Sequence, residues 1–213
     1  MNSSPERRPR LGVPIILTAP SGTGKTTLCH RVLSVLQDVT LSVSFTTRAP
    51  RTGEIDGVDY HFVSRDAFEQ RMNEGRFLEW ANVHGNLYGT GTEYRDQWVA
   101  EGRDVLFDVD VQGAERLAQV FPYAAKVFLL PPTFAALESR LRGRAQDAPD
   151  AIERRLLNAR RELLAVRSFH HVIINDDLGE AAQTFIGLIR AERVRTTRQE
   201  SVIAQLLAAL ESL

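Results

Sequence analysis

Several features are scarce or missing in this chain of 213 residues, and each shortage narrows what the protein can be. The single cysteine, Cys29, excludes an intramolecular disulfide, and its place in a predicted helix favours a small buried side chain over a reactive thiol. A formal net charge of -1 provides no overall positive field for nucleic acid or an anionic membrane. The histidines show no metal-ligand spacing, and no Ser/His/Asp or Cys/His set indicates covalent catalysis.

Long hydrophobic runs are also missing from the sequence. No apolar stretch approaches the roughly 20 residues that a membrane-spanning helix needs. Residues 1–10 are polar and arginine-rich, lack the apolar centre of a signal peptide, and are predicted to form a disordered tail. We therefore expect a cytoplasmic protein that binds neither membrane nor nucleic acid.

Lysine is the scarcest charged residue, because only Lys25 and Lys126 occur among many arginines. A single arginine is therefore weak evidence for an anion site, whereas Lys25 stands out. It lies where an apolar run, residues 13–18, enters a glycine-bearing loop that ends in Gly24-Lys25-Thr26 before a helical pattern. This layout indicates a P-loop, whose backbone N–H groups bind phosphate while Lys25 reaches the β- and γ-phosphates and the Thr26 hydroxyl binds Mg²⁺.

The expected ATP-binding segment is Ala19, Pro20, Ser21, Gly22, Thr23, Gly24, Lys25, Thr26 and Thr27. Ala19 departs from the motif G-x-x-x-x-G-K-[ST], which has glycine there. Its methyl costs little if φ is negative and about 1 kcal/mol or more if φ is positive. Asp108 ends a predicted buried strand close to this loop, where it could steer Mg²⁺ or, alternatively, cap the next helix.

The periodicity of apolar residues predicts an α/β fold. Five buried strands are expected at residues 13–18, 41–45, 102–108, 125–130 and 171–174, alternating with helices at 26–36, 112–120, 133–141, 151–167 and 178–193. This pattern predicts a three-layer α/β/α core with a parallel five-stranded sheet and a ligand beyond the carboxyl ends of the strands. Alternating strands at 58–63, 77–83 and 87–90, around a helix capped by Ser64 and ended by Gly75, predict an inserted mixed α+β subdomain.

A second polar cluster lies in the first part of this insertion. It contains hydroxyl groups, two arginines and a phenol, contributed by Ser44, Thr46, Thr47, Arg48, Arg51 and Tyr60. These groups suit a phosphomonoester, although composition alone leaves a solvated loop as an equal alternative.

The segment 46–62 resembles the signature of the guanylate kinase family. It has two hydroxyl residues followed by Arg48, and then Arg51, Glu54, Gly57, Tyr60 and Phe62. The resemblance continues through Phe77-Leu78-Glu79-Trp80-Ala81, Tyr88-Gly89-Thr90, Asp108-Val109-Asp110-Val111-Gln112-Gly113, Arg140-Leu141-Arg142-Gly143-Arg144 and Ile174-Asn175-Asp176-Asp177. It implies a P-loop core (11–43, 100–137 and 168–198), a GMP-binding subdomain (44–99), a helical lid (138–167) and a C-terminal helix (199–213).

The resemblance also implies an activity, namely transfer of the γ-phosphoryl group of ATP to GMP, and to dGMP, with Mg²⁺. The implied GMP-binding residues are Ser44, Arg48, Arg51, Glu54, Tyr60, Glu79, Tyr88, Thr90 and Asp110. The implied catalytic residues are Lys25, Arg140, Arg144 and Arg155; Thr26 and Asp108 would serve the metal, and Asn175 would contact the adenine of ATP.

Glu79 and Thr90 suit guanine for a chemical reason. Guanine presents N1–H and N2–H₂ side by side, and one carboxylate accepts from both, while O6 accepts from a hydroxyl. Adenine lacks the N1 donor and would leave the carboxylate unpaired, at a cost of roughly 1–3 kcal/mol or more. Two alternatives stay open: a guanylate-kinase-like domain that binds phosphorylated partners without catalysis, and a related kinase with another phosphorylated acceptor. A monomer and a homo-oligomer also both remain open, since the apolar stripe of the terminal helix suits its own core or a second subunit.

Overall fold

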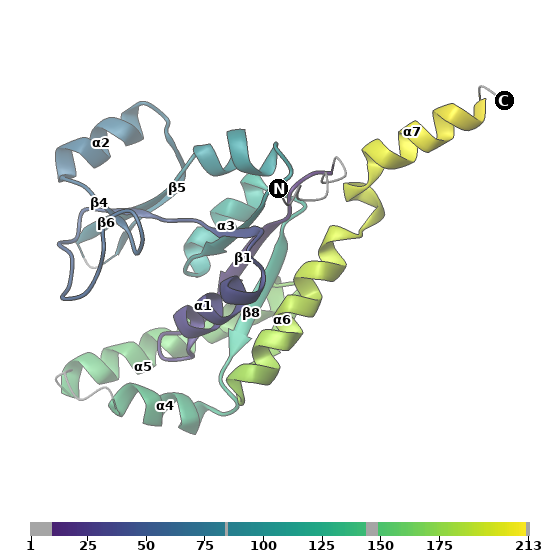
Figure 1. Cartoon of the computed structure of the whole chain (residues 1–213). Helices are drawn as coiled ribbons and strands as arrows, with labels where there is room; N and C mark the ends of the chain where they lie inside the picture. Colours follow the sequence, from purple (N-terminus) through teal and green to yellow (C-terminus); the bar gives the residue numbers. More distant parts are fainter. Residues whose placement is uncertain (1–9, 84, 144–148, 212–213) are drawn as a thin grey trace.

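A computed structural model describes residues 10–83, 85–143 and 149–211 (Figure 1). Its centre is a five-stranded parallel sheet in the order β2-β7-β1-β8-β9. The strands are β1 (Pro14–Thr18), β2 (Val39–Leu41), β7 (Asp104–Asp108), β8 (Ala125–Leu130) and β9 (His171–Ile174). The predicted α/β core with a parallel five-stranded sheet is therefore confirmed.

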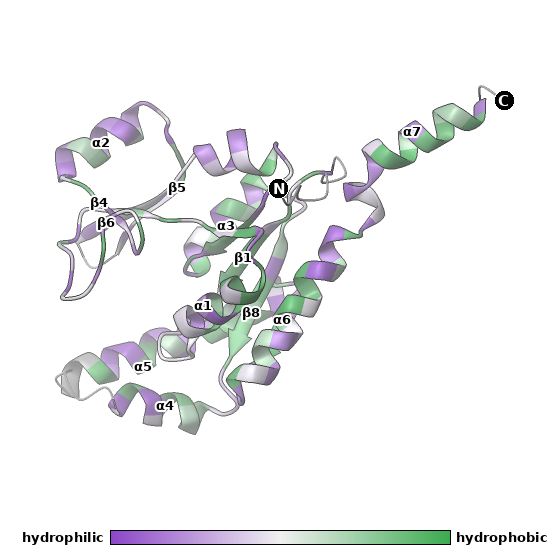
Figure 2. Ribbon diagram, viewed as in Figure 1, coloured by the Kyte–Doolittle hydropathy of each residue, from purple (hydrophilic) through white to green (hydrophobic). Residues whose placement is uncertain are grey.

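Helices cover both faces of this sheet. They are α1 (Lys25–Val35), α3 (Val111–Val120) and α6 (Leu178–Arg193). Successive strand side chains point to opposite faces, so Ile15 and Leu17 of β1 pack in the cluster of α1 and α6, whereas Ile16 packs with α3. Figure 2 shows green, hydrophobic strands enclosed by helices with purple stretches on their outer sides. Burial on both faces explains why β1 is a continuous apolar run.

A second sheet, in the order β4-β3-β6-β5, forms a separate lobe (Figure 1). Its elements are β3 (Phe45–Thr46), β4 (His61–Phe62), β5 (Phe77–Val83), β6 (Asn86–Gly91) and α2 (Arg65–Asn73). Phe68 of α2 packs against Phe45 and Leu87 of the sheet. The predicted helix start is confirmed, because the Ser64 hydroxyl accepts the Ala67 N–H at 3.1 Å.

Two predicted strands differ from the structure. The strand expected at 41–45 divides into β2 and β3 in different sheets, because the Val43 N–H between them donates to the Tyr94 hydroxyl, at 2.7 Å, and not to a neighbouring strand. The strand expected at 58–63 shortens to β4, because the N–H groups of Val58 and Asp59 bond back to the carbonyl of Ile55 in a turn. Periodicity also missed a short π-helix, η1 (Tyr94–Val99), which packs against the core sheet.

The remaining helices lie outside the three layers. The helices α4 (Phe134–Arg142) and α5 (Pro149–Leu164) share a small hydrophobic core of their own. The α-helix predicted at 151–167 ends at Leu164 and continues as the 3-10 turn η2 (Ala165–Ser168). The C-terminal helix α7 (Glu200–Glu211) projects away from the body and buries no residue (Figure 1).

Two features of the sequence analysis fall outside the described residues, namely most of the expected tail, residues 1–9, and the lid residue Arg144. In the described part of the chain, every helix is too short or too polar to cross a membrane. The expected division of the chain into core, inserted subdomain and lid stays a prediction.

Candidate functional site

The order of the strands brings the P-loop and Asp108 together. β1 and β7 are neighbours, with Leu17 opposite Asp108, and the helices that follow them lie on opposite faces of the sheet. Such a switch point opens a crevice at the carboxyl ends of the strands. The first turn of α1, with Lys25, and the end of β7, with Asp108, border this crevice.

Two glycines shape the P-loop. Gly22 and Gly24 have φ of 89° and 94°, a left-handed conformation that favours glycine. A side chain would also collide, since a Cβ on Gly24 would lie 2.7 Å from Nδ2 of Asn175. Gly24 is the N-cap of α1, so the N–H groups of the following turn lack intrahelical partners and can bind an anion.

Ala19 lies in the hydrophobic cluster beneath this loop. It is 8% exposed and belongs to the same cluster as Leu17 and Leu28. Its methyl therefore removes apolar surface from water, which contributes favourably where the motif has glycine. Cys29 belongs to the same cluster and is buried, as predicted.

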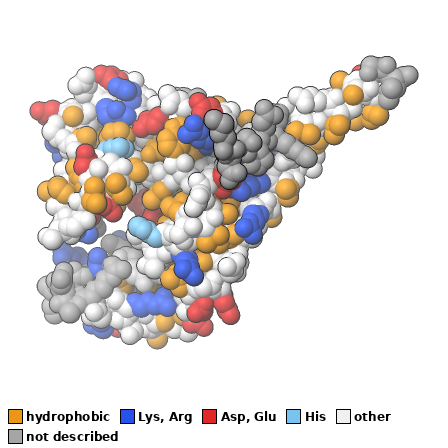
Figure 3. All heavy atoms as spheres, viewed as in Figure 1, with side chains coloured by type: hydrophobic (Ala, Val, Ile, Leu, Met, Phe, Trp, Pro, Cys, Tyr) orange, Lys and Arg blue, Asp and Glu red, His pale blue; other side chains and the backbone are white. Residues whose placement is uncertain are grey.

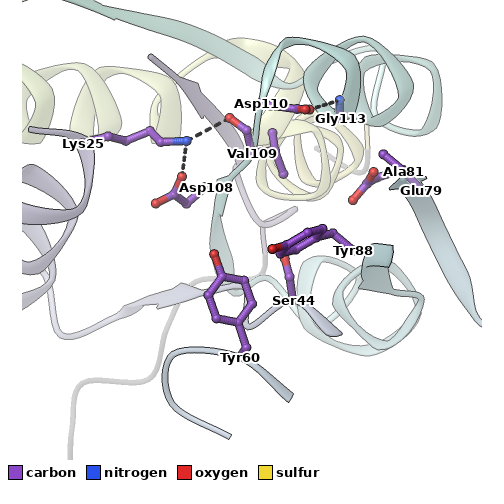
Figure 4. A pocket seen from close by; sticks show the side chains of 10 residues that line it. All are labelled: Lys25, Ser44, Tyr60, Glu79, Ala81, Tyr88, Asp108, Val109, Asp110 and Gly113. Atoms are coloured by element: carbon purple, nitrogen blue, oxygen red, sulfur yellow. Dashed lines mark hydrogen bonds and ion pairs between the residues drawn. The ribbon is translucent and has the colours of Figure 1, made fainter. Parts of the chain in front are cut away.

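Lys25 is held at the crevice by two contacts (Figure 4). Its Nζ forms an ion pair with Asp108 and donates to the Val109 carbonyl at 3.0 Å. Burial lowers the pKa of Lys25, but attraction to Asp108 and the hydrogen bond to it outweigh burial, so the pKa is raised above its usual value. Lys25 is therefore charged at any physiological pH.

Asp108 and Thr26 fit the coordination chemistry of Mg²⁺. Thr26 lies exposed in the first turn of α1, and Asp108 is about a quarter exposed at the end of β7. Among the residues that the structure describes, no group of three acidic, histidine or cysteine side chains could hold a metal by itself. Mg²⁺ commonly binds one or two protein oxygens together with water and substrate phosphates, and the Thr26 hydroxyl and the Asp108 carboxylate are oxygens of this kind.

A cavity of about 260 Å³ extends from Lys25 toward the second sheet. Figure 3 shows this face of the molecule hollowed between the lobe of α2 and the lobe of α4 and α5. The cavity is lined by Lys25, Ser44, Tyr60, Glu79, Ala81, Tyr88, Asp108, Val109, Asp110 and Gly113 (Figure 4). The structure thus brings five of the residues implied to bind GMP to the same cavity as Lys25.

Glu79 and Thr90 form a buried pair at one end of this cavity. Thr90 donates its hydroxyl proton to Oε1 of Glu79 at 2.7 Å, and Glu79 is 8% exposed. Burial raises the pKa of Glu79, and Asp110 raises it further, against the lowering by the Thr90 hydrogen bond. Because a hydroxyl has one proton, Thr90 cannot also donate to a base oxygen without turning away from Glu79.

Asp110 has a structural contact of its own. It is the N-cap of α3 and accepts the Gly113 N–H at 2.8 Å. The capping role considered for Asp108 therefore belongs to Asp110, and Asp108 pairs with Lys25 instead.

The arginine-rich loop before β4 is held together by Glu54. Arg48 donates to both carboxylate oxygens of Glu54, at 3.0 and 2.8 Å, and Glu54 also accepts the Arg51 N–H at 2.7 Å. The hydrogen bond from Arg48, followed by that from Arg51, lowers the pKa of Glu54. Glu54 therefore pairs with Arg48 and does not line the cavity, whereas the Arg51 side chain is exposed.

Two side chains tie the P-loop to neighbouring elements. Asn175, at the end of β9, is buried and donates to the Thr23 carbonyl at 2.7 Å. Arg140 of α4 reaches the carbonyls of Thr23 and Asn175 at 3.5 and 3.2 Å. Arg155 is half-buried on α5. Arg140 and Asn175 thus contact the backbone on which ATP would bind.

Sequence reasoning missed Glu162 of α5, which also faces the P-loop. Its Oε2 atom is buried without a hydrogen-bond partner among the described residues. Burial raises its pKa, while Lys25 and the Ser21 N–H lower it. A signal was available, because Glu162 follows Arg155 by seven residues and so lies on the same helical face.

The chain is similar to several known proteins. The family model described as guanylate kinase matches residues 12–192. A guanylate kinase of Thiobacillus denitrificans is 48% identical over 88% of this chain and 90% of its own length. A guanylate kinase of Aromatoleum aromaticum is 48% identical over 94% of this chain and 98% of its own length. The crystal structure of guanylate kinase from Anaplasma phagocytophilum has a TM-score of 0.73 and 32% identity, covering 89% of this chain and 90% of its own.

Proposed function

The chain belongs to the guanylate kinase family, and on this premise we propose that it transfers the γ-phosphoryl group of ATP to GMP and dGMP. One observation supports the proposal most strongly. A single cavity is lined by Lys25 beside the P-loop at one end and, at the other, by Glu79, which is suited to guanine and is hydrogen-bonded to the buried Thr90. A phosphoryl donor and a purine monophosphate acceptor would therefore meet within it.

On the donor side, the P-loop binds the phosphates of ATP. Backbone N–H groups of the loop, which Pro20 lacks, and the Lys25 ammonium neutralise charge on the β- and γ-phosphates. We propose Thr26 and Asp108 as the residues that hold Mg²⁺, which supplies further charge stabilisation to the transferring group. Asn175 positions the loop through Thr23.

On the acceptor side, Ser44, Tyr60, Tyr88, Arg48 and Arg51 would bind the phosphate of GMP. A phosphate monoester is largely ionised at neutral pH because its second pKa is about 6, so transfer needs no general base. Glu54 would act through Arg48, since its two oxygens fix the guanidinium. Glu79, with Thr90 and Asp110, would bind the base.

Arginines of the lid complete the site. We propose that Arg140, Arg155 and Arg144 surround the anionic transition state when α4 and α5 close over ATP. Closure also excludes water, which would otherwise compete with GMP as the acceptor. A cytoplasmic location, with ATP and GMP as the small-molecule partners, belongs to the same proposal.

An acceptor panel tests the proposal. The protein is incubated with Mg-ATP and either GMP, dGMP, AMP, CMP or UMP, and ADP release is followed. We expect turnover with GMP and dGMP only. No turnover with any acceptor would support a binding domain without catalysis, and a preference for AMP would contradict the assignment of Glu79.

The two lysines provide a matched pair of variants for the same assay. Lys25→Met should lower kcat at least 100-fold, while Lys126→Met, at a lysine that bonds to Ser168 away from the cavity, should leave it unchanged.

A further inference from the structure

The backbone conformation at Gly113 does not require glycine. It lies in the first turn of α3, and its φ is outside the left-handed range. Glycine within a helix lowers stability relative to alanine, because the unfolded chain loses more freedom on folding. A glycine at this position therefore indicates a need for space.

The space that Gly113 leaves open belongs to the cavity (Figure 4). A Cβ there would lie 3.5 Å from Oε2 of Glu79, 3.3 Å from Oδ1 of Asp110 and 3.0 Å from Cβ of Val109. The other oxygen of Glu79, Oε1, already accepts from Thr90. Oε2 is the Glu79 oxygen that borders the space left open by Gly113.

We propose that Gly113 determines specificity at the acceptor site, because its missing side chain leaves room for the N1–H and N2–H₂ edge of guanine at Glu79 Oε2. The inference rests on the proposed function of the cavity. A hydrogen bond to Oε2 needs a donor at about 2.9 Å. A methyl group 3.5 Å from the same oxygen takes up part of the space through which a donor would approach, and a buried carboxylate that loses its partner is destabilised.

Gly113→Ala tests this proposal, and Gly187→Ala is its matched control. Gly187 also lies within a helix, α6, and a Cβ there would meet nothing within 4 Å. In Gly113→Ala we expect KM for GMP to rise at least tenfold and KM for ATP to stay within twofold. Gly187→Ala should change neither. A KM for GMP within twofold of the wild type in Gly113→Ala would overturn the proposal.

A second readout is independent of how much protein folds. Inosine monophosphate lacks the N2 amino group, so it can donate fewer hydrogen bonds to Glu79 than GMP. Its use as an acceptor should therefore be impaired less when the approach to Glu79 is restricted. The ratio of kcat/KM for GMP to that for inosine monophosphate should fall at least fivefold in Gly113→Ala, because both acceptors sample the same folded fraction. An unchanged ratio contradicts the role of Gly113.

Glu79→Gln separates this inference from the proposed function. If Glu79→Gln leaves GMP use unchanged, the assignment of the cavity is wrong. If Glu79→Gln impairs GMP use while Gly113→Ala does not, only the role of Gly113 is wrong.

Discussion

At the scale of single residues, Glu79 shows how a group suited to recognition can lower stability. Its carboxylate is buried beside the cavity and its pKa is raised, chiefly by burial. A raised pKa means that the folded protein disfavours the ionised form relative to the unfolded chain. Ionised Glu79 therefore destabilises the fold at neutral and alkaline pH, while under the proposed function it would provide the charged acceptor for a guanine base.

Glu79→Gln should reveal this conflict. The amide removes the buried charge, so Tm should rise at pH 8, where Glu79 is ionised in both states. The gain should shrink as pH falls below the folded pKa, because the wild-type carboxyl becomes neutral there too. The kcat/KM for GMP should fall about 100-fold, since the pair of donors on guanine loses its carboxylate.

Calorimetry at pH 8 and pH 5, together with steady-state kinetics, measures both effects. Glu115→Gln, at an exposed position on α3, is the control and should change neither quantity. A lower Tm for Glu79→Gln at pH 8 would contradict the argument.

Cys29 carries a potentially reactive thiol that solvent and reagents cannot reach, because it is buried in the core. Burial, with Asp108 adding to it, raises the pKa of its thiol to about 12. The thiolate is the nucleophile, and below this pKa the thiol is protonated. We expect no reaction with a disulfide reagent at pH 8 in the native protein and one thiol per chain in denaturant. Rapid native reaction, followed by absorbance, would show that Cys29 is accessible.

At the scale of elements, a β-bulge decides which residues meet at the end of the cavity where we propose that the base binds. β5 pairs with β6 so that Phe77 lies opposite Gly91, but Glu79 lies opposite Thr90. Regular antiparallel pairing from Phe77 would have placed Glu79 opposite Gly89. Bulges commonly re-aim a side chain next to an active site. Here the extra residue, Leu78, packs into the core cluster of α3.

Asn175, at the end of β9, positions the P-loop through its side chain. Asn175→Ala removes the hydrogen bond to the Thr23 carbonyl and should loosen the loop. We expect KM for ATP to rise about tenfold with KM for GMP little changed, and a loss of roughly 1–3 kcal/mol in the free energy of unfolding. Asp176→Ala, at the exposed neighbour, should alter none of these values. Equal changes in both KM values would place the role of Asn175 elsewhere.

At the scale of the whole molecule, Asp104 connects distant parts of the chain at the start of β7, away from the cavity. This carboxylate is fully buried and accepts from Arg10, from the Val13 N–H and from Arg193 of α6. The contacts join the beginning of the described chain, the central sheet and the last core helix. Their loss would leave two arginines without this partner.

Asp104→Ala should therefore lower the free energy of unfolding by about 3–5 kcal/mol, as expected when one partner of a buried ion pair is removed. The remaining folded protein should keep its preference for GMP over AMP, because the cavity lies at the opposite ends of the strands. Urea denaturation and the acceptor assay measure these two quantities. Asp38→Ala, at a partly exposed partner of Arg193, should cost much less. An altered acceptor preference would indicate coupling between the two ends of the sheet.

Much of the fold could be predicted because a strand that is buried on both faces of a sheet has a continuous run of apolar residues in the sequence. The apolar run of β8 has the predicted bounds, since a strand covered by helices needs apolar residues on both sides. The edge strand β9 also has the predicted bounds, although Val172 and Ile174 are exposed and it is therefore not buried on both faces as expected. Short strands such as β3 and β4 have two residues each and leave no periodicity to detect. The π-helix at Tyr94–Val99 was missed for a similar reason, since it follows neither standard period.

The sequence by itself predicted the chemistry of the protein, through the P-loop motif with Lys25 and through the resemblance to guanylate kinase that assigns an arginine- and hydroxyl-rich acceptor segment and the Glu79 and Thr90 pair. Local patterns suffice there, because the loop depends on Gly22, Gly24 and the helix that follows. Only the tertiary structure decided which partners these groups have: Asp108 for Lys25, Arg48 for Glu54, and Glu162 near the P-loop. The reason is physical, because such contacts depend on strand order, a single bulge and the approach of α5, and no sequence period encodes these distances.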